Sequence, residues 1–377
     1  MWPPDLMDEL VEEILFRLPP SDPASLVRAA LACKRWFRLV SDPGFRRRFR
    51  KFHRTPTPSM LGFVYRYERA NHFIPTSSFR PPCAKLGFLG HWNWYPIDAR
   101  HGFFLFFDVL LYGPAKMTFI VLNPITGKEW RLPMPKFKYE FWSAAVLCGT
   151  AGCDHLDCPC DAFRVVFVGT RRTNEFTSAC VYSSQAGTWS MTASVRHLMD
   201  RVMRGRSTFV GNKLYFICRF SNRILEYDLE KQELAVISLP STCKAWGVSV
   251  MTAEEGGLGF AIVQKGKLCI WSREEAGPEG WEQRMVIQLA ESLLPDRYLS
   301  SSPSVVAFAD GAGVVFTYAA YSGGGFAIDL KSGLVQSIGG VAGYGYHCSV
   351  LPYMSSYPPV LRATSTGVGS REGPSIA

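Results

Sequence analysis

Residues 224–240 read ILEYDLEKQELAVISLP, and the pattern in this stretch recurs along most of the chain. An apolar run ends at Asp228, charged residues follow, and a second apolar run begins at Leu234. Short apolar runs bounded by turn-forming residues are typical of two β-strands joined in a hairpin. We therefore predict a hairpin whose turn follows Asp228.

The same pattern returns four times. The stretches are FIVLNPITGKEWRLP (119–133), ACVYSSQAGTWSMT (179–192), KLCIWSREEAGPEGWEQ (267–283) and GFAIDLKSGLVQSIG (325–339). In each, the predicted turn follows Asn, Asp or Ser, and the second strand opens with Trp or Leu. The marker residues Leu122, Tyr182, Tyr227, Trp271 and Ile328 are spaced by 60, 45, 44 and 57 residues. Four-stranded repeats of about 45 residues are typical of a β-propeller.

The large domain is therefore expected to span residues 59–354. One four-stranded blade cannot bury both of its faces, whereas a ring of blades buries them against each other. At roughly 45–50 residues per blade, this length predicts an all-β domain with the fold of a six- or seven-bladed β-propeller. A pair of β-sandwiches is the competing architecture. Residues 355–377 are rich in Ser, Thr, Gly and Pro, and we expect a disordered tail there.

The N-terminal residues follow a different period. Residues 3–45 read PPDLMDELVEEILFRLPPSDPASLVRAALACKRWFRLVSDPGF, in which Leu6, Leu10, Ile14 and Leu18 fall on one helical face. We predict one helix capped by Asp5 and ended by Pro19-Pro20, a second capped by Asp22, and a third around Trp36. Together they make a small all-α module over residues 1–47. Since so few residues bury little apolar area, such a module is usually completed by a partner.

This stretch resembles an F-box. The residues that carry the resemblance are Ile14-Leu15, Leu18-Pro19, Leu26-Val27, Cys33-Lys34-Arg35-Trp36 and Ser41-Asp42-Pro43 with Phe45. The opening differs from the usual Leu-Pro and reads Pro4-Asp5-Leu6-Met7. Joined to a propeller, the module is similar to plant-type F-box proteins with a C-terminal F-box-associated domain.

The resemblance implies docking to the Skp-type adaptor of an SCF-type cullin ubiquitin ligase. The residues that it assigns to the adaptor contact are Pro4, Leu6, Leu10, Ile14, Leu15, Leu18, Pro19, Leu26, Val27 and Trp36. The chain would then be a non-catalytic substrate receptor, with a target protein held by the propeller. Two alternatives stay open: an adaptor-binding protein that acts outside a ligase, and a ligand- or sugar-binding propeller with a helical cap.

The two domains are expected to be joined by residues 48–58. Phe45, Phe49 and Phe52 recur at helical spacing among basic residues, and Thr55-Pro56-Thr57-Pro58 favours a stiff extended link. Between residues 33 and 54 lie nine Lys and Arg against the single Asp42, in a chain of net charge +9. This segment either meets an anionic surface or is a solvated helix face; we expect no nucleic-acid partner.

Two further motifs contain residue types that are typical of binding sites. CGTAGCDHLDCPCD (148–161) offers Cys153, His155, Cys158 and Cys160 as zinc ligands, but a second pair of ligands separated by a loop is missing. We predict no metal, no cofactor and no catalytic residues. The aromatic stretch 79–108 contains His91, Trp92, Trp94 and Tyr95, which suit either a recognition surface or blade packing around a tight turn at residues 100–102.

The composition also bears on location. The N-terminus carries acids where a secretory signal would carry positive charge, and no apolar run reaches the roughly 18 residues of a spanning helix. Eleven scattered cysteines are typical of reduced thiols. We expect an intracellular protein of the cytoplasm or nucleus, without a membrane partner.

Overall fold

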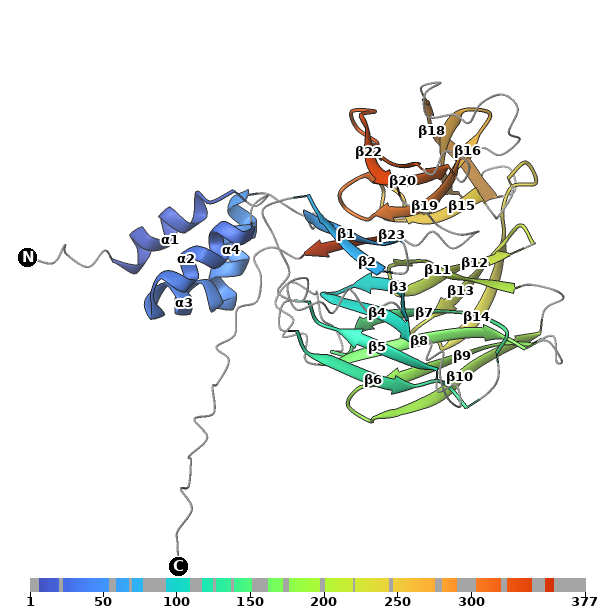
Figure 1. Ribbon diagram of the computed structural model, residues 1–377, viewed down its shortest axis with the longest axis horizontal. Helices are drawn as coiled ribbons and strands as arrows, with labels where there is room; N and C mark the ends of the chain where they lie inside the picture. The colour runs from blue at the N-terminus through green and yellow to red at the C-terminus, as the bar shows by residue number, and fades with distance from the viewer. Residues whose placement is uncertain are drawn as a thin grey trace, which may run out of the picture.

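The computed structural model describes residues 7–19, 23–53, 59–67, 70–76, 93–108, 117–124, 127–136, 139–150, 162–171, 176–196, 201–219, 221–243, 247–274, 280–289, 303–319, 324–340 and 350–355. In this part of the chain, four helices come first and strands follow. Figure 1 shows the helices as a separate lobe beside the strands. No helix in the described ranges is both long and apolar enough to cross a membrane.

The described part of the helical module is built from four short helices. These are α1 (Asp8–Phe16), α2 (Pro23–Ala32), α3 (Lys34–Ser41) and α4 (Pro43–His53), of which α3 and α4 have side-chain caps. The Cys33 thiol accepts a hydrogen bond from the Trp36 amide at 3.4 Å and caps α3, and the Asp42 carboxylate accepts one from the Phe45 amide at 2.7 Å and caps α4. The predicted cap Asp5 was wrong, because α1 begins at Asp8 and its N-cap is Met7, whose side chain makes no capping hydrogen bond. The predicted cap Asp22 lies outside the described residues.

Helix α4 continues past the boundary predicted at residue 47. Phe45 and Phe49 are fully buried, and the Phe16 ring stacks on Phe45 with ring centroids 5.3 Å apart. The first half of the predicted basic link is therefore a helix that packs into the helical module. Residues 54–58, which hold the Thr-Pro repeats, lie outside the described residues.

The strands form a six-bladed β-propeller, as the sequence predicted with six or seven blades. Five blades have four described strands each, in sequence order. The first and second of these blades consist of β3 (Trp94–Arg100), β4 (Phe103–Asp108), β5 (Thr118–Leu122) and β6 (Glu129–Pro133), and of β7 (Phe141–Cys148), β8 (Phe163–Thr170), β9 (Phe176–Ser183) and β10 (Thr188–Arg196). The third consists of β11 (Arg201–Val210), β12 (Lys213–Arg219), β13 (Arg223–Asp228) and β14 (Glu233–Ser238). The fourth and fifth consist of β15 (Val248–Thr252), β16 (Leu258–Gln264), β17 (Lys267–Arg273) and β18 (Trp281–Gln288), and of β19 (Ser304–Ala309), β20 (Val314–Ala319), β21 (Gly324–Asp329) and β22 (Val335–Gly340).

The sixth blade joins the two ends of the strand region. Its described strands are β23 (Val350–Ser355), β1 (Ser59–Tyr67) and β2 (Ala70–Pro75), with β1 in the middle. Ser59 pairs with Ser355, and Tyr65 pairs with Val350. The innermost strands β3, β7, β11, β15, β19 and β23 each contact the next, and β23 contacts β3, so the ring is closed.

The five repeated hairpins of the sequence join the third and fourth strands of the five four-stranded blades. The marker residues lie at or near the end of the third strand, as Leu122 does in β5 and Ile328 in β21. The recurrent Trp on the fourth strand connects neighbouring blades. The Trp189 indole donates to the Pro133 carbonyl at 2.7 Å, and the Trp281 indole donates to the Ser238 carbonyl at 2.8 Å.

The propeller has two faces, which the strand directions define. We call top the face at which the innermost strands begin, and bottom the face at which they end. Second strands consequently end at the top, and third strands begin there. Since β1 is a second strand and β23 an innermost one, Ser59 and Ser355 both lie at the bottom.

Candidate functional site

The first candidate site is the outer side of helix α1. Its inner side packs into the core of the helical module, where Val11 and Leu15 are buried against residues of α2, α3 and α4. Its outer side carries Met7, Leu10 and Ile14, with exposed fractions of 64%, 42% and 46%. These residues recur at spacings of three and four, so they form one stripe along the helix. Helix α1 with its N-cap Met7 thus has a broad apolar surface, and the part that carries the exposed stripe has no cover within the described residues.

The structure divides the ten predicted adaptor contacts into groups. Leu10, Ile14 and Pro19 are exposed, whereas Leu18 and Trp36 are partly buried and pack against the core of the module. Leu15 and Leu26 are fully buried, so they stabilise the module from inside and are not on its surface. Pro4 and Leu6 lie outside the described residues, and the side chain of Val27 does too.

Ion pairs fix the orientation of α1. The Glu12 carboxylate accepts two hydrogen bonds from the Arg48 guanidinium, at 2.5 and 3.0 Å, and the Asp8 carboxylate accepts one from Arg35 at 2.6 Å. The hydrogen bond from Arg48 to Glu12 raises the pKa of that guanidinium. The Arg35–Asp8 pair is exposed on both sides and Arg48 is exposed too, whereas Glu12 is only 17% exposed. Pairs with exposed partners contribute little stability, so we assign them the orientation of α1 on α3 and α4.

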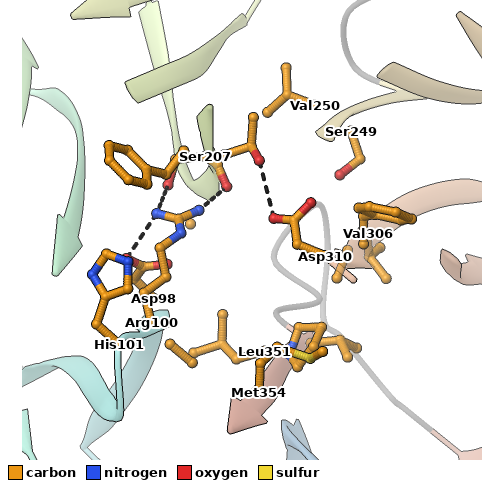
Figure 2. A pocket seen from close by; sticks show the side chains of 18 residues that line it. Asp98, Arg100, His101, Ser207, Ser249, Val250, Val306, Asp310, Leu351 and Met354 are labelled. Atoms are coloured by element: carbon orange, nitrogen blue, oxygen red, sulfur yellow. Dashed lines mark hydrogen bonds and ion pairs between the residues drawn. The ribbon is translucent and has the colours of Figure 1, made fainter. Parts of the chain in front are cut away.

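The second candidate site is a cavity of about 230 Å³ inside the ring of innermost strands. Figure 2 shows Asp98 and Arg100 of β3 on one side, and Asp310, which follows β19, on another. The Arg100 guanidinium lies 3.0 Å from the Asp98 carboxylate and donates to both the hydroxyl and the carbonyl of Ser207 on β11. This network reaches across the middle of the propeller from the first four-stranded blade to the third.

The carboxylates of the cavity also bind backbone and hydroxyl groups of other blades. Asp98 accepts a hydrogen bond from the Val146 amide of β7 at 2.8 Å. Asp310 accepts bonds from the Thr252 amide at 3.2 Å and the Thr208 hydroxyl at 3.3 Å. Burial raises the pKa of Asp98, and it also raises the pKa of Asp310. Because these groups already connect different blades, we assign them a role in holding the ring together.

Sequence reasoning missed the cavity. The tight turn after Arg100 was expected and is present, with His101 and Gly102 at φ of 51° and 81°. The ion pair between Asp98 and Arg100 could have been predicted from their spacing. Residues two apart on one strand point to the same face of the sheet. Asp310 carries no comparable local signal, because its partners come from other blades.

The remaining predicted site residues take different positions. Trp94 is fully buried in the propeller, whereas Tyr95 is 39% exposed; His91 and Trp92 lie outside the described residues. The zinc candidates Cys153, His155, Cys158 and Cys160 also lie outside them. Within the described ranges, no three His, Cys, Asp or Glu side chains are grouped so as to hold a metal ion.

An F-box-type helical module followed by a six-bladed propeller defines the class of this protein. Residues 8–51 match the F-box-like family model. Residues 101–361 match the model described as F-box protein AT5G49610-like, beta-propeller, which covers well over half of the chain. The chain therefore belongs to the family of AT5G49610-like F-box proteins with a β-propeller.

Two individual proteins are similar to this chain. F-box protein At5g03970 of Arabidopsis thaliana is 24% identical over 296 residues, which are 70% of this chain and 65% of that protein. The chain thus spans slightly less than two thirds of this relative. A solved structure of a putative 6-phosphogluconolactonase from Bacteroides uniformis covers 78% of this chain and 93% of its own, with 11% identity and a TM-score of 0.38. That overall similarity is too low to bear on function.

Proposed function

We propose that this protein is the substrate receptor of an SCF-type cullin ubiquitin ligase. The helical module docks on a Skp-type adaptor, and the propeller holds a target protein. Membership of the F-box family supports this role, and so does the architecture of a small docking module followed by a large β domain. The receptor itself is non-catalytic: it raises the effective concentration of a target lysine beside the charged ubiquitin carrier.

The observation that carries the proposal is the exposed stripe of Met7, Leu10 and Ile14. Apolar side chains at helical spacing fit an apolar groove of a partner, which is a common mode of helix recognition. The stripe lies beside the residues that α1 buries in its own module, and its side chains are exposed, so a partner can cover it without unfolding the helix. Pro19 follows the end of α1, is exposed, and extends the proposed contact. Leu18 and Trp36 are partly buried, and their exposed atoms lie within the same proposed contact.

Affinity purification of the tagged full-length chain tests this function. The wild type is expected to co-purify both the adaptor and the cullin, and to support ubiquitin transfer to a bound protein in the purified assembly. Leu10→Ser/Ile14→Ser is expected to lose both, because serine cannot supply the apolar contact. Recovery of the adaptor without cullin would indicate an adaptor-binding protein that acts outside a ligase. Recovery of neither would contradict docking and favour a ligand-binding propeller.

A further inference from the structure

Five arginines at the top of the propeller stack on aromatic rings. The distances from the guanidinium carbon to the ring centroid are 4.1 Å for Arg66 on Tyr95, 5.9 Å for Arg131 on Trp94, 5.4 Å for Arg171 on Tyr139, 4.5 Å for Arg201 on Phe141, and 4.2 Å for Arg204 on Trp142. We call these five arginines the arginine face. They come from four neighbouring blades, and Arg131, Arg201 and Arg204 are exposed.

A local departure from regular pairing positions Arg204. On β11, Val202 pairs with Cys218 and Ser207 with Phe216, so residues 203–206 bulge opposite the single residue between those partners. Gly205 has a φ of 77°, a conformation that glycine adopts readily, and its amide donates to the Ser143 hydroxyl at 3.2 Å. The bulge thereby carries Arg204 onto Trp142 of the preceding blade. Bulges commonly re-aim side chains in this way at functional surfaces.

The arginine face has few acids near it. At the top ends of the described strands and in the described loops between them, we find Asp108 and Glu140. Asp108 is buried and binds Arg131 at 3.2 Å, together with Asn93. The Glu129 carboxylate lies 2.8 Å from the same guanidinium, so Arg131 already has two carboxylate partners. The hairpins at the bottom, by contrast, carry acids, including Asp228 and Asp329. Among the described residues, the top of the propeller therefore carries fewer acids than the hairpins at the bottom.

We propose that the arginine face binds an acidic segment of a partner protein. Guanidinium groups positioned over rings lose little further side-chain freedom when they bind a carboxylate, and arginine pairs with carboxylates in a bidentate geometry. The inference rests on the proposed function, because it assigns the chemistry of the target that the receptor would hold. The chain enters and leaves the propeller at the bottom, through Ser59 and Ser355, so the arginine face lies at the opposite end of the ring.

An acidic protein segment fits this surface better than a nucleic acid does. Single-stranded nucleic acids are held by bases that stack on aromatic side chains. Here Tyr95, Phe141 and Trp142 each have an arginine over the ring. The positively charged guanidinium groups over these rings suit carboxylates better than bases.

The test is fluorescence-polarisation titration of the full-length chain with a labelled peptide of repeating Glu-Glu-Gly. A matched Gln-Gln-Gly peptide and poly-uridylate RNA serve as further probes. Arg201→Gln/Arg204→Gln removes two charges from the arginine face, and Lys128→Gln/Lys231→Gln removes two from the bottom. The first variant is expected to weaken acidic-peptide binding at least about tenfold, because it removes two sites of charge-assisted hydrogen bonding. The second is expected to bind as the wild type does.

Arg201→Lys/Arg204→Lys keeps both positive charges but replaces the guanidinium groups, and we expect it to recover part of the affinity. Such recovery would also show that the bulge tolerates substitution. Equal weakening by both Gln variants, equal binding of the Gln-Gln-Gly peptide, or tighter binding of poly-uridylate would overturn the inference. Adaptor binding is measured on the same preparations. Adaptor binding without peptide binding contradicts this inference alone, whereas peptide binding without adaptor binding contradicts the receptor role alone.

Discussion

Gln232 shows how a single residue can depart from the repeat around it. Three hairpins between third and fourth strands have glycine four residues after the turn-forming Asn, Ser or Asp. These are Gly127, Gly187 and Gly333, with φ of 71°, 68° and 68°. In the hairpin that follows Asp228, the equivalent residue is Gln232, with a φ of 56°. A side chain in this left-handed conformation costs about 1–2 kcal/mol.

We predict that Gln232→Gly raises the free energy of unfolding by up to about 1 kcal/mol, because relief of this strain exceeds the extra chain entropy of glycine. Denaturant unfolding of the full-length chain measures it. Gly187→Gln is the matched control and should lower the free energy of unfolding by about 1 kcal/mol, since a Cβ at Gly187 would meet no atom within 4 Å and only the backbone changes. A destabilised Gln232→Gly variant would refute the explanation.

Asp98 is the residue on which the central network depends most. Its side chain is 7% exposed and that of Arg100 is 15% exposed. Asp98→Ala is expected to lower the free energy of unfolding by about 3 kcal/mol, because it leaves a buried guanidinium and the Val146 amide without their carboxylate. Asp98→Asn keeps an acceptor and should cost less. Ser249→Ala changes another buried polar group of the same cavity and should cost less than Asp98→Ala, because it removes no charge. Equal losses in the two alanine variants would contradict this role.

At the scale of elements, different residues of helix α1 contribute to the stability of the module and to the proposed docking. Leu15 faces the core of its own module, whereas Ile14 faces outward. We predict that Leu15→Ala destabilises the module by about 2–4 kcal/mol and speeds hydrogen exchange across α1, α2 and α4. Ile14→Ala should leave the exchange of these helices unchanged. Mass spectrometry of the deuterated full-length chain measures both, and fast exchange in Ile14→Ala would mean that this residue supports the fold.

The elements that the sequence predicted are those with local signals. Pro23 at the first turn of α2 and the alternating runs around Asp228 depend on neighbours along the chain, so hairpins and helices were found. Which side of α1 is buried was not predictable, because Leu10, Ile14 and Leu15 are all apolar and the packing partners Phe45 and Phe49 come from α4. The helical spacing of Phe45, Phe49 and Phe52 was visible in the sequence, but the boundary of the module was placed at residue 47, within α4.

At the scale of the whole molecule, ring closure is the feature that local patterns could not reveal. The sixth blade combines β1 and β2 with β23, whose paired residues lie almost three hundred positions apart in the sequence. No hairpin repeat marks that blade, so the sequence predicted six or seven blades without a choice between them. Long-range pairing of this kind also makes the ends of the domain essential to its stability.

We predict that a chain ended at residue 349 loses cooperative thermal unfolding, because β1 loses its inner partner and the contact of β23 with β3 disappears. A chain ended at residue 356 keeps every described strand and should melt at the temperature of the full-length chain. Scanning calorimetry distinguishes the two. Identical melting of the 349-residue chain and the full-length chain would show that β23 does not close the ring.

Calorimetric titration of the full-length chain with a Skp-type adaptor tests the central claim most directly. Leu10→Ala/Ile14→Ala should weaken binding at least about tenfold, because each buried aliphatic side chain contributes about 1.5–3 kcal/mol. Met191→Ala/Leu334→Ala removes equally exposed apolar side chains from the propeller and should leave the affinity unchanged. Wild-type affinity in Leu10→Ala/Ile14→Ala, or no adaptor binding by the wild type, would contradict the docking of this protein through helix α1.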